Sequence, residues 1–198
     1  MPSSFFLIIV REWGIVMKKQ WLDWIKAFVI AAVLAIVVRV FLFAPVVVEG
    51  PSMLPTLHSS DHLIVSKINY TLGSPERFEV VVFHATEKKD YIKRVIGLPG
   101  DHVEYKNDKL YINGQEMAEP FLKDEKEHVD SGQMLTDDFT IEELPGGYEE
   151  VPENHFLVLG DNRTNSTDSR MLGVIPADQI VGEAILSYWP LNRIEFIN

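Results

Sequence analysis

The sequence contains no cysteine, and this absence removes several kinds of chemistry at once. Without thiols the chain can form no disulfide, offers no thiolate nucleophile and cannot bind a metal through sulfur. If the protein is an enzyme that uses a nucleophile, that group must therefore be sought among hydroxyls.

Basic residues are scarce in one part of the chain, and that part sets the net charge of the whole protein, which is −11. Between residues 102 and 155, fifteen acidic residues stand against four basic ones, whereas the rest of the chain is balanced. Because phosphate binding requires a basic face, this composition argues against a nucleic-acid partner. Within that part, residues 119–150 show only weak periodicity, which suggests a mobile excursion or a small subdomain.

Charge is also nearly absent from residues 27–48, the longest apolar run in the sequence. Arg39 is the only charged residue in this run, which has about the ~20 residues needed to cross a bilayer. A buried core helix would show a polar face, and this run has none. The run is longer than the apolar part of a signal peptide and lacks a good cleavage site, so we expect a retained transmembrane anchor.

The residues before this run indicate its orientation. They include aromatic and basic side chains, namely Trp21, Trp24, Lys18, Lys19 and Lys26. Tryptophans suit a membrane interface and lysines are retained in the cytoplasm, so we expect residues 1–26 inside and residues 49–198 outside the cell. Arg39 lies late enough in the run to reach the outer surface. Because Met17 followed by two lysines resembles a natural start, residues 1–16 are interpreted as an over-extended reading frame.

Short runs of β-branched and aromatic residues follow the anchor, each bounded by turn residues. They occupy residues 63–65, 79–83, 91–96, 103–105, 109–112, 155–159 and 180–189. The polar residues 84–90 read as the tip of a hairpin, and Asn113-Gly114 is a strong signal for another. No amphipathic helix of normal length appears, so we expect a mainly β domain.

The segment directly after the apolar run, residues 50–56, has the sequence Gly-Pro-Ser-Met-Leu-Pro-Thr. It cannot be regular helix, because proline lacks an N–H and restricts the residue before it. The resulting rigid loop would aim the hydroxyl of Ser52 as a nucleophile requires. Such loops are also common as plain connectors, and the segment taken alone favours that interpretation.

A serine nucleophile needs a base, and two kinds of residue are available. Six histidines stand in no recognisable setting: His58, His62, His84, His102, His128 and His155. Lys93 lies in a predicted strand, where it and Arg94 point to opposite faces, one inward and one outward. Burial among apolar residues would lower the pKa of the lysine and make it a usable base. From periodicity alone, a salt-bridged lysine on a strand is the favoured interpretation.

Four segments in order behind the apolar run closely resemble the signature of bacterial type I signal peptidases, peptidase family S26. They are residues 50–56, 61–67, 91–101 and 160–170. The resemblance covers the chain from residue 27 to its end and looks like the compact Gram-positive branch. It implies a β fold of coiled antiparallel sheets and a serine–lysine dyad that cuts signal peptides from exported proteins at the outer membrane face. No cofactor is implied, and the expected partners are exported preproteins and the lipid bilayer.

By this resemblance Ser52 corresponds to the nucleophile and Lys93 to the general base. Ser166 corresponds to a serine that hydrogen-bonds the lysine, while Asp168 and Arg170 match a supporting polar pair. The family's preference for small residues before the cut implies two shallow pockets beside an extended substrate. Candidate wall residues are Met53, Leu54, Ile92 and Val95, the first two of which are equally placed to contact lipid.

One residue of this sequence departs from the pattern found in part of the family. Gly50 stands where some members carry a serine that helps to hold the oxyanion, so the backbone N–H of Ser52 must do more of that work.

Residues 161–172 faintly resemble a calcium loop, but Ser166 and Leu172 stand where glycine and glutamate belong, so no metal is expected. A self-cleaving serine–lysine repressor is an alternative kind of enzyme, but such proteins carry a DNA-binding domain and no anchor, so the apolar run argues against it. An inactive anchored binding module is the non-enzyme alternative; it would have lost Ser52 or Lys93, and both are present.

Overall fold

The computed structural model describes residues 21–37, 39, 42–68, 70, 73–86, 89–129 and 133–197, and the chain divides into two units, residues 1–42 and 43–198. In the first unit, residues 21–37 are helical. Among the described residues, no helix combines the length and the apolar character that crossing a membrane requires. Residues 1–16 and Met17, interpreted above as an over-extended frame and a natural start, lie outside the described residues.

The last part of the predicted span 27–48 is a strand rather than a helix. Strand β1 (Phe43–Val47) pairs antiparallel with β2 (His62–Ser66), and its partly buried side chains pack on the core beneath that sheet. Pro45 fits this position, because β1 is an edge strand and a missing N–H at an edge need not break a ladder. The predicted end of the anchor at residue 48 is therefore wrong, since these apolar residues serve a β-sheet.

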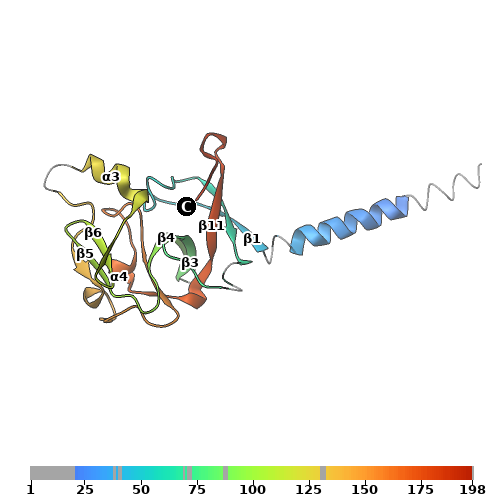
Figure 1. Ribbon diagram of the computed structural model, residues 1–198. Helices are drawn as coiled ribbons and strands as arrows, with labels where there is room; N and C mark the ends of the chain where they lie inside the picture. Colours follow the sequence, from blue (N-terminus) through green and yellow to red (C-terminus); the bar gives the residue numbers. More distant parts are fainter. Residues whose placement is uncertain are drawn as a thin grey trace, which may run out of the picture. The chain divides into compact units, whose positions relative to one another are not determined.

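The second unit contains two antiparallel sheets (Figure 1). The larger has the strand order β1-β2-β11-β3-β4-β9-β10, and β12 pairs with β11. Its further strands are β3 (Val80–Thr86), β4 (Lys89–Gly97), β9 (His155–Leu159), β10 (Ile175–Pro176), β11 (Ile180–Trp189) and β12 (Glu195–Phe196). The runs predicted at 155–159 and 180–189 coincide with β9 and β11, and the predicted hairpin around residues 84–90 is formed by β3 and β4.

The smaller sheet has the order β7-β6-β5-β8 and lies on the opposite side of the second unit from β1 and β11 (Figure 1). Its strands are β5 (Val103–Lys106), β6 (Lys109–Ile112), β7 (Gln115–Met117) and β8 (Phe139–Thr140). Asn113 and Gly114 adopt φ values of 52° and 77°, the left-handed pair that a two-residue hairpin turn needs. The hairpin predicted at this position is confirmed.

The helical segments of the second unit are short. Those whose bounds lie wholly within the described residues are η2 (Pro120–Leu122), α3 (Lys123–His128), η3 (Ile141–Glu143), α4 (Ser169–Leu172), η4 (Ala177–Gln179) and η5 (Leu191–Arg193). Three of them lie in the acidic segment 119–150, and two of these three bring isolated apolar side chains into the core, namely Leu122 from η2 and Ile141 from η3. Phe139 and Leu144 are buried in the same cluster as Ile141. The described residues of this segment, 119–129 and 133–150, thus pack beside the small sheet, which favours the expected small subdomain over the mobile excursion.

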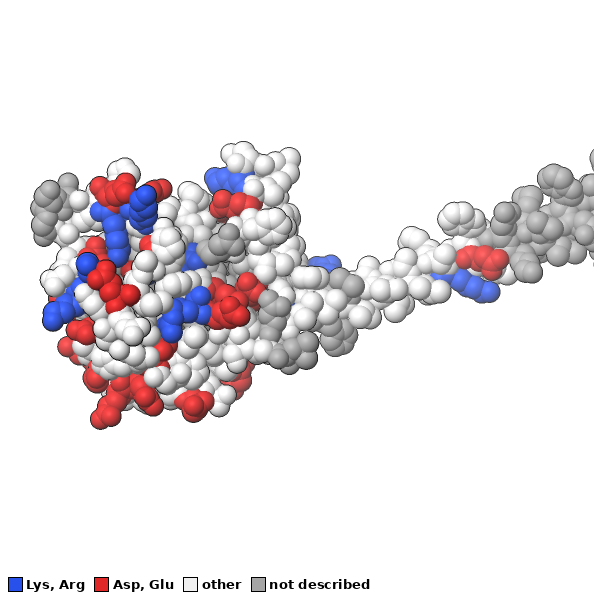
Figure 2. Space-filling model, viewed as in Figure 1, with Lys and Arg blue, Asp and Glu red and all other residues white. Residues whose placement is uncertain are grey.

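The larger sheet is covered on both faces where β3 and β4 lie. Val80 and Val82 belong to one core cluster and Val81 and Phe83 to another, so alternate residues of β3 point into different clusters. A third cluster joins the small sheet to the ends of β4 and β9. Figure 2 shows acidic side chains in separate groups on the visible face of the second unit, with basic side chains among them.

Candidate active site

The Ser52 hydroxyl and the Lys93 amine meet at the point where the turn after β1 passes β4. Lys93 Nζ donates to Ser52 Oγ at 2.7 Å and to the carbonyl oxygen of Ile92 at 2.7 Å. The two side chains come from segments far apart in the sequence, and their separation is within the reach that direct proton transfer requires.

The Lys93 side chain lies in a dry environment. The residue is only 3% exposed, and the ring centre of Tyr91 lies 5.3 Å from its Nζ. Burial lowers the pKa of the amine from its ordinary 10.5 to about 8, although the negative charges of Asp168 and Asp161 act in the opposite direction. The amine is therefore partly uncharged at mildly alkaline pH, and only the uncharged form can accept a proton.

A groove of about 500 Å³ opens onto this pair. Residues 46–51 line one side of it and residues 89–92 of β4 another, while Asn165 and Thr167 complete the lining. β1 is an edge strand, and residues 89–92 pair only with β3 among the described strands, since β9 joins β4 from Arg94 onward. The groove thus runs along strand edges with which an extended peptide can form backbone hydrogen bonds.

The segment after β9 holds the turn that carries Ser52. The backbone N–H of Asn162 donates to the carbonyl oxygen of Ser52 at 3.1 Å, and its side-chain amide donates to that of Pro51, also at 3.1 Å. A Cβ at Gly160 would lie 2.4 Å from the Ser52 carbonyl oxygen and 2.2 Å from Ser166 Oγ. The approach of these two backbones therefore requires glycine at position 160.

A buried ion pair between Arg94 and Asp161 lies next to the Ser52 turn. Arg94 donates to Asp161 from Nε (2.9 Å) and from Nη2 (2.8 Å), and both side chains are fully buried. Thr56 Oγ1 donates to Asp161 at 2.6 Å, and the Arg94 guanidinium lies 4.1 Å from the ring centre of Phe121. The prediction that one of Lys93 and Arg94 faces outward is wrong, because both faces of β4 are covered. Asp161 and Asn162 received no role from the sequence, although both stand in the motif 160–170.

Asp168 and Arg170 form the polar pair that the sequence suggests. Arg170 donates to the Asp168 carboxylate through Nε (2.9 Å) and Nη2 (2.8 Å), and the backbone N–H of Gly160 donates to the same carboxylate at 3.0 Å. Burial by itself raises the pKa of the Asp168 carboxyl, but these partners hold it below its ordinary value. Ser166 Oγ is buried and makes no hydrogen bond within the described residues, so the expected bond to Lys93 is not formed here.

Comparison with known proteins decides the family. The family model described as signal peptidase, peptidase S26, matches residues 21–189. The chain belongs to this family. It is a serine endopeptidase that removes signal peptides.

Curated relatives and a solved structure agree with this membership. Signal peptidase I of Bacillus caldolyticus is 47% identical over 178 residues, which cover 90% of this chain and 94% of the relative. Signal peptidase IB of Staphylococcus aureus is 43% identical over 183 residues, covering 91% and 95%. A crystal structure of a signal peptidase I from Enterococcus faecalis matches with 40% identity and a TM-score of 0.53, over 56% of this chain and 96% of that one.

These matches confirm the resemblance read from the four sequence segments, including the Gram-positive branch, and the mainly β fold. They give no support to a self-cleaving repressor or to an inactive binding module.

The predicted pocket walls divide into two groups. Met53 and Ile92 line the groove, and their contact with a substrate stays a prediction. Leu54 is half-buried and is not part of the groove lining, and Val95 is fully buried in the core cluster that contains Val81. The predicted role of Val95 is wrong, because this position of β4 points into the core. No histidine stands among the described residues that line the groove.

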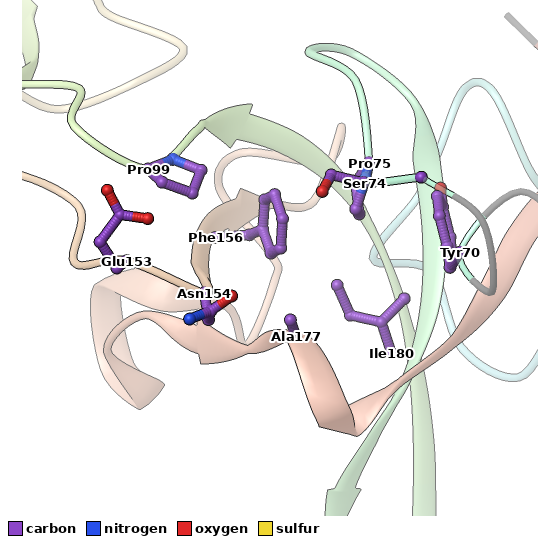
Figure 3. Close-up of a pocket in the computed structure, with 10 residues that line it drawn as sticks. Tyr70, Ser74, Pro75, Pro99, Glu153, Asn154, Phe156, Ala177 and Ile180 are labelled. Carbon is purple, nitrogen blue, oxygen red and sulfur yellow. The ribbon is translucent and has the colours of Figure 1, made fainter.

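A second, smaller pocket of about 150 Å³ lies away from the serine–lysine pair. Figure 3 shows the ring of Phe156 between Tyr70 at one end and Pro99 with Glu153 at the other. The Tyr70 hydroxyl donates to Glu79 at 2.8 Å, and burial raises the pKa of this phenol. Its oxygen is thus kept protonated and is no nucleophile, so the groove at Ser52 is the better candidate for the reaction.

Proposed function

We propose that Ser52 is the nucleophile and Lys93 the general base of this signal peptidase. The observation that carries the proposal is the 2.7 Å contact between Lys93 Nζ and Ser52 Oγ, made by a lysine whose pKa burial lowers to about 8. The neutral amine takes the hydroxyl proton while Oγ bonds to the scissile carbonyl carbon. The resulting ammonium then protonates the leaving nitrogen as the C–N bond breaks, and a water molecule repeats the cycle on the acyl-enzyme.

The backbone N–H of Ser52 is the proposed donor to the oxyanion. Within the described residues this N–H makes no hydrogen bond, and it adjoins the attacking hydroxyl. A side chain at Gly50 would meet nothing within 4 Å, so this side of the turn is open to the carbonyl oxygen of a substrate. Loss of one such donor costs on the order of 2.7–4 kcal/mol of transition-state stabilisation.

The polar residues of the motif 160–170 are proposed to support the lysine. The Ser166 hydroxyl has no hydrogen bond in the described residues, which leaves it available to the ammonium that forms when Lys93 accepts the proton. Asp168, fixed by Arg170 and the Gly160 N–H, contributes a negative charge that favours this ammonium. We assign Ser166 an orienting role and Asp168 with Arg170 a supporting one.

The substrate is proposed to bind as an extended strand between β1 and β4. The strand edges on both sides of the groove supply backbone partners, and Met53 and Ile92 supply apolar walls. Walls this close to the reacting serine favour small side chains before the cut, as the family resemblance implies. A preprotein with leucine in place of alanine directly before the cut should be processed at least tenfold more slowly, as measured by initial rates.

Residues before β1 are proposed to anchor the protein, with the second unit outside the cell. The apolar run begins at residue 27, and residues 21–37 expose large apolar side chains along a helix, which lipid would cover. Lysines precede this run, in keeping with a cytoplasmic N-terminus. Protease added to intact protoplasts should degrade the region after residue 48; protection until lysis would mean that the orientation is reversed.

The decisive experiment mixes the detergent-solubilised full chain with a purified preprotein and sequences the N-terminus of the product. Ser52→Ala should abolish cleavage without changing the thermal unfolding midpoint by more than a few degrees. Ser59→Ala is the matched control, because Ser59 is an exposed serine of the same loop and should remain fully active. Cleavage by Ser52→Ala at the same site would assign the reaction to another nucleophile.

A further inference from the structure

The buried carboxylate of Glu119 lies outside the four segments that carry the family resemblance, and the proposed chemistry does not use it. Its side chain is 1% exposed and pairs with Arg163, whose side chain is 0% exposed, at 2.6 Å between Oε1 and Nη2. Glu119 does not line the groove. A buried pair of charges is weak evidence for stability, since desolvation opposes the attraction, but it fixes geometry.

Both members of this pair are held by several further bonds. Arg163 Nη1 donates to Tyr105 Oη at 2.8 Å and to Thr136 Oγ1 at 3.1 Å. Tyr105 Oη donates to Glu119 Oε1 at 2.5 Å, and Lys126 Nζ donates to Oε2 at 3.1 Å. Tyr105 of the small sheet and Glu119 and Thr136 of the acidic segment thus surround the Arg163 guanidinium, and these three residues are called the socket.

The socket is connected to the nucleophile through a short stretch of backbone. Arg163 Nε donates to the carbonyl oxygen of Gly160 at 3.2 Å, closing the turn 160–163 on itself. Asn162, inside this turn, donates to the carbonyl oxygens of both Pro51 and Ser52. The position of the Ser52 backbone, and with it the direction of its Oγ toward Lys93, therefore depends on where Arg163 holds the turn.

We propose that Glu119 is a positioning residue for peptide hydrolysis, which acts through Arg163 and the turn 160–163 to hold Ser52 at hydrogen-bonding distance from Lys93. The inference rests on the proposed roles of Ser52 and Lys93. Burial raises the pKa of the Glu119 carboxyl, but Arg163 and the Tyr105 hydroxyl outweigh it and keep the carboxylate charged. A neutral side chain at position 119 leaves the Arg163 charge buried without its counterion, and the turn it closes then shifts.

The test compares Glu119→Gln with Glu127→Gln in the full chain, using a peptide that carries a cleavage site. Glu127 is an exposed acid of α3, so its change removes the same charge from the same segment without touching the socket. A displacement of about 1 Å at a reacting group costs roughly 100-fold in rate. We expect Glu119→Gln to lower kcat by about 10- to 100-fold with KM within twofold of the parent. Glu127→Gln should leave both constants unchanged.

Two further variants separate positioning from folding. The double variant Glu119→Gln with Arg163→Gln should lower kcat little more than the more damaging of the two single variants does, because both changes break the same connection. If Glu119→Gln does not fold, Tyr105→Phe takes its place, since it removes only the hydroxyl that bridges both charges, and the same split between kcat and KM is expected.

A folded Glu119→Gln protein, judged by near-UV circular dichroism, with kcat within twofold of the parent overturns the proposal. So does a loss of activity that matches the fraction of unfolded protein. Ser52→Ala measured in the same assay keeps the two proposals apart: residual cleavage there refutes the dyad, whereas an inactive Ser52→Ala beside a fully active Glu119→Gln refutes only the positioning role.

Discussion

At the scale of single residues, Lys93 is subject to opposing influences on its charge. Burial disfavours the ammonium, while the carboxylates of Asp168 and Asp161 favour it, and burial prevails. The result is a pKa of about 8, low enough for a neutral base and high enough for the ammonium to return a proton to a leaving amine.

The pH dependence of the reaction should follow this one group. If neutral Lys93 accepts the Ser52 proton, as proposed, kcat/KM should fall about tenfold for each pH unit below about 8 and level off above it. Lys93→Arg should be inactive at every usable pH, since the guanidinium stays charged. A profile governed by a pKa near 6.5, or one abolished by any single histidine change in a folded protein, would point to histidine instead.

The same burial predicts that Lys93 destabilises the fold. The pKa of Lys93 is about 8 in the folded protein and 10.5 in the unfolded chain. Between these two pH values the unfolded chain binds more protons at this residue than the folded protein does, so the free energy of unfolding rises with pH. Below pH 8 the full penalty, about 3 kcal/mol, is present. Lys93→Met should therefore be inactive but more stable than the parent at pH 6, and the gain should shrink toward pH 10.5 in urea unfolding. A destabilised Lys93→Met protein at pH 6 contradicts this.

Arg94 shows which part of the site could not be read from the sequence. The motif singles out the dipeptide Lys93-Arg94, and strand alternation separates the two side chains. Alternation cannot show that a second layer covers the other face of β4, because Asp161 and Phe121 come from segments distant in the sequence. Removing one partner of such a buried pair costs about 3–5 kcal/mol. Arg94→Met should lower the free energy of unfolding by that amount, whereas the exposed Lys106→Met should change it by less than 0.5 kcal/mol.

At the scale of elements, the connection between β9 and α4 carries more of the site than any strand. Its turn holds Ser52 through Asn162 and the ion pair through Asp161, and it passes so close to Ser52 that position 160 admits no side chain. Gly160→Ala should lower kcat by about 100-fold or more, because the added methyl must displace the serine backbone. Gly114→Ala is the control: a Cβ there meets nothing within 4 Å, so only backbone strain and no loss of kcat is expected.

The elements also show why the strands were predictable and the acidic segment was not. β9 is apolar from Phe156 to Leu159, β11 is rich in β-branched and aromatic residues, and the turn at Asn113-Gly114 has a specific backbone requirement. Residues of the segment 119–150 instead reach the core singly from short turns, and Glu119 is buried together with its partners Arg163 and Tyr105. Such contacts depend on the tertiary fold and leave no periodic pattern.

At the scale of the whole molecule, the division between the two units falls at residues 42 and 43, so β1 belongs to the catalytic unit. β1 is the outer strand of the large sheet, its residues Ala44 and Val46 pack on the core, and its end lines the groove. A catalytic domain that starts at residue 49, as the sequence suggests, would lack strand β1, its packing on the core and its part of the groove.

Two truncated proteins test this division. Residues 43–198 should fold and cleave a signal-peptide substrate in solution, because the unit keeps both sheets and the complete groove. Residues 49–198 lose the packing of Ala44, Val46 and Val48, each worth about 1–3 kcal/mol, and should unfold roughly 10 °C or more below the longer protein. The shorter protein should also be inactive, since it lacks the strand edge along which the substrate is proposed to pair. Equal unfolding midpoints by circular dichroism, together with equal cleavage rates, would show that β1 is dispensable and that the catalytic unit begins after it.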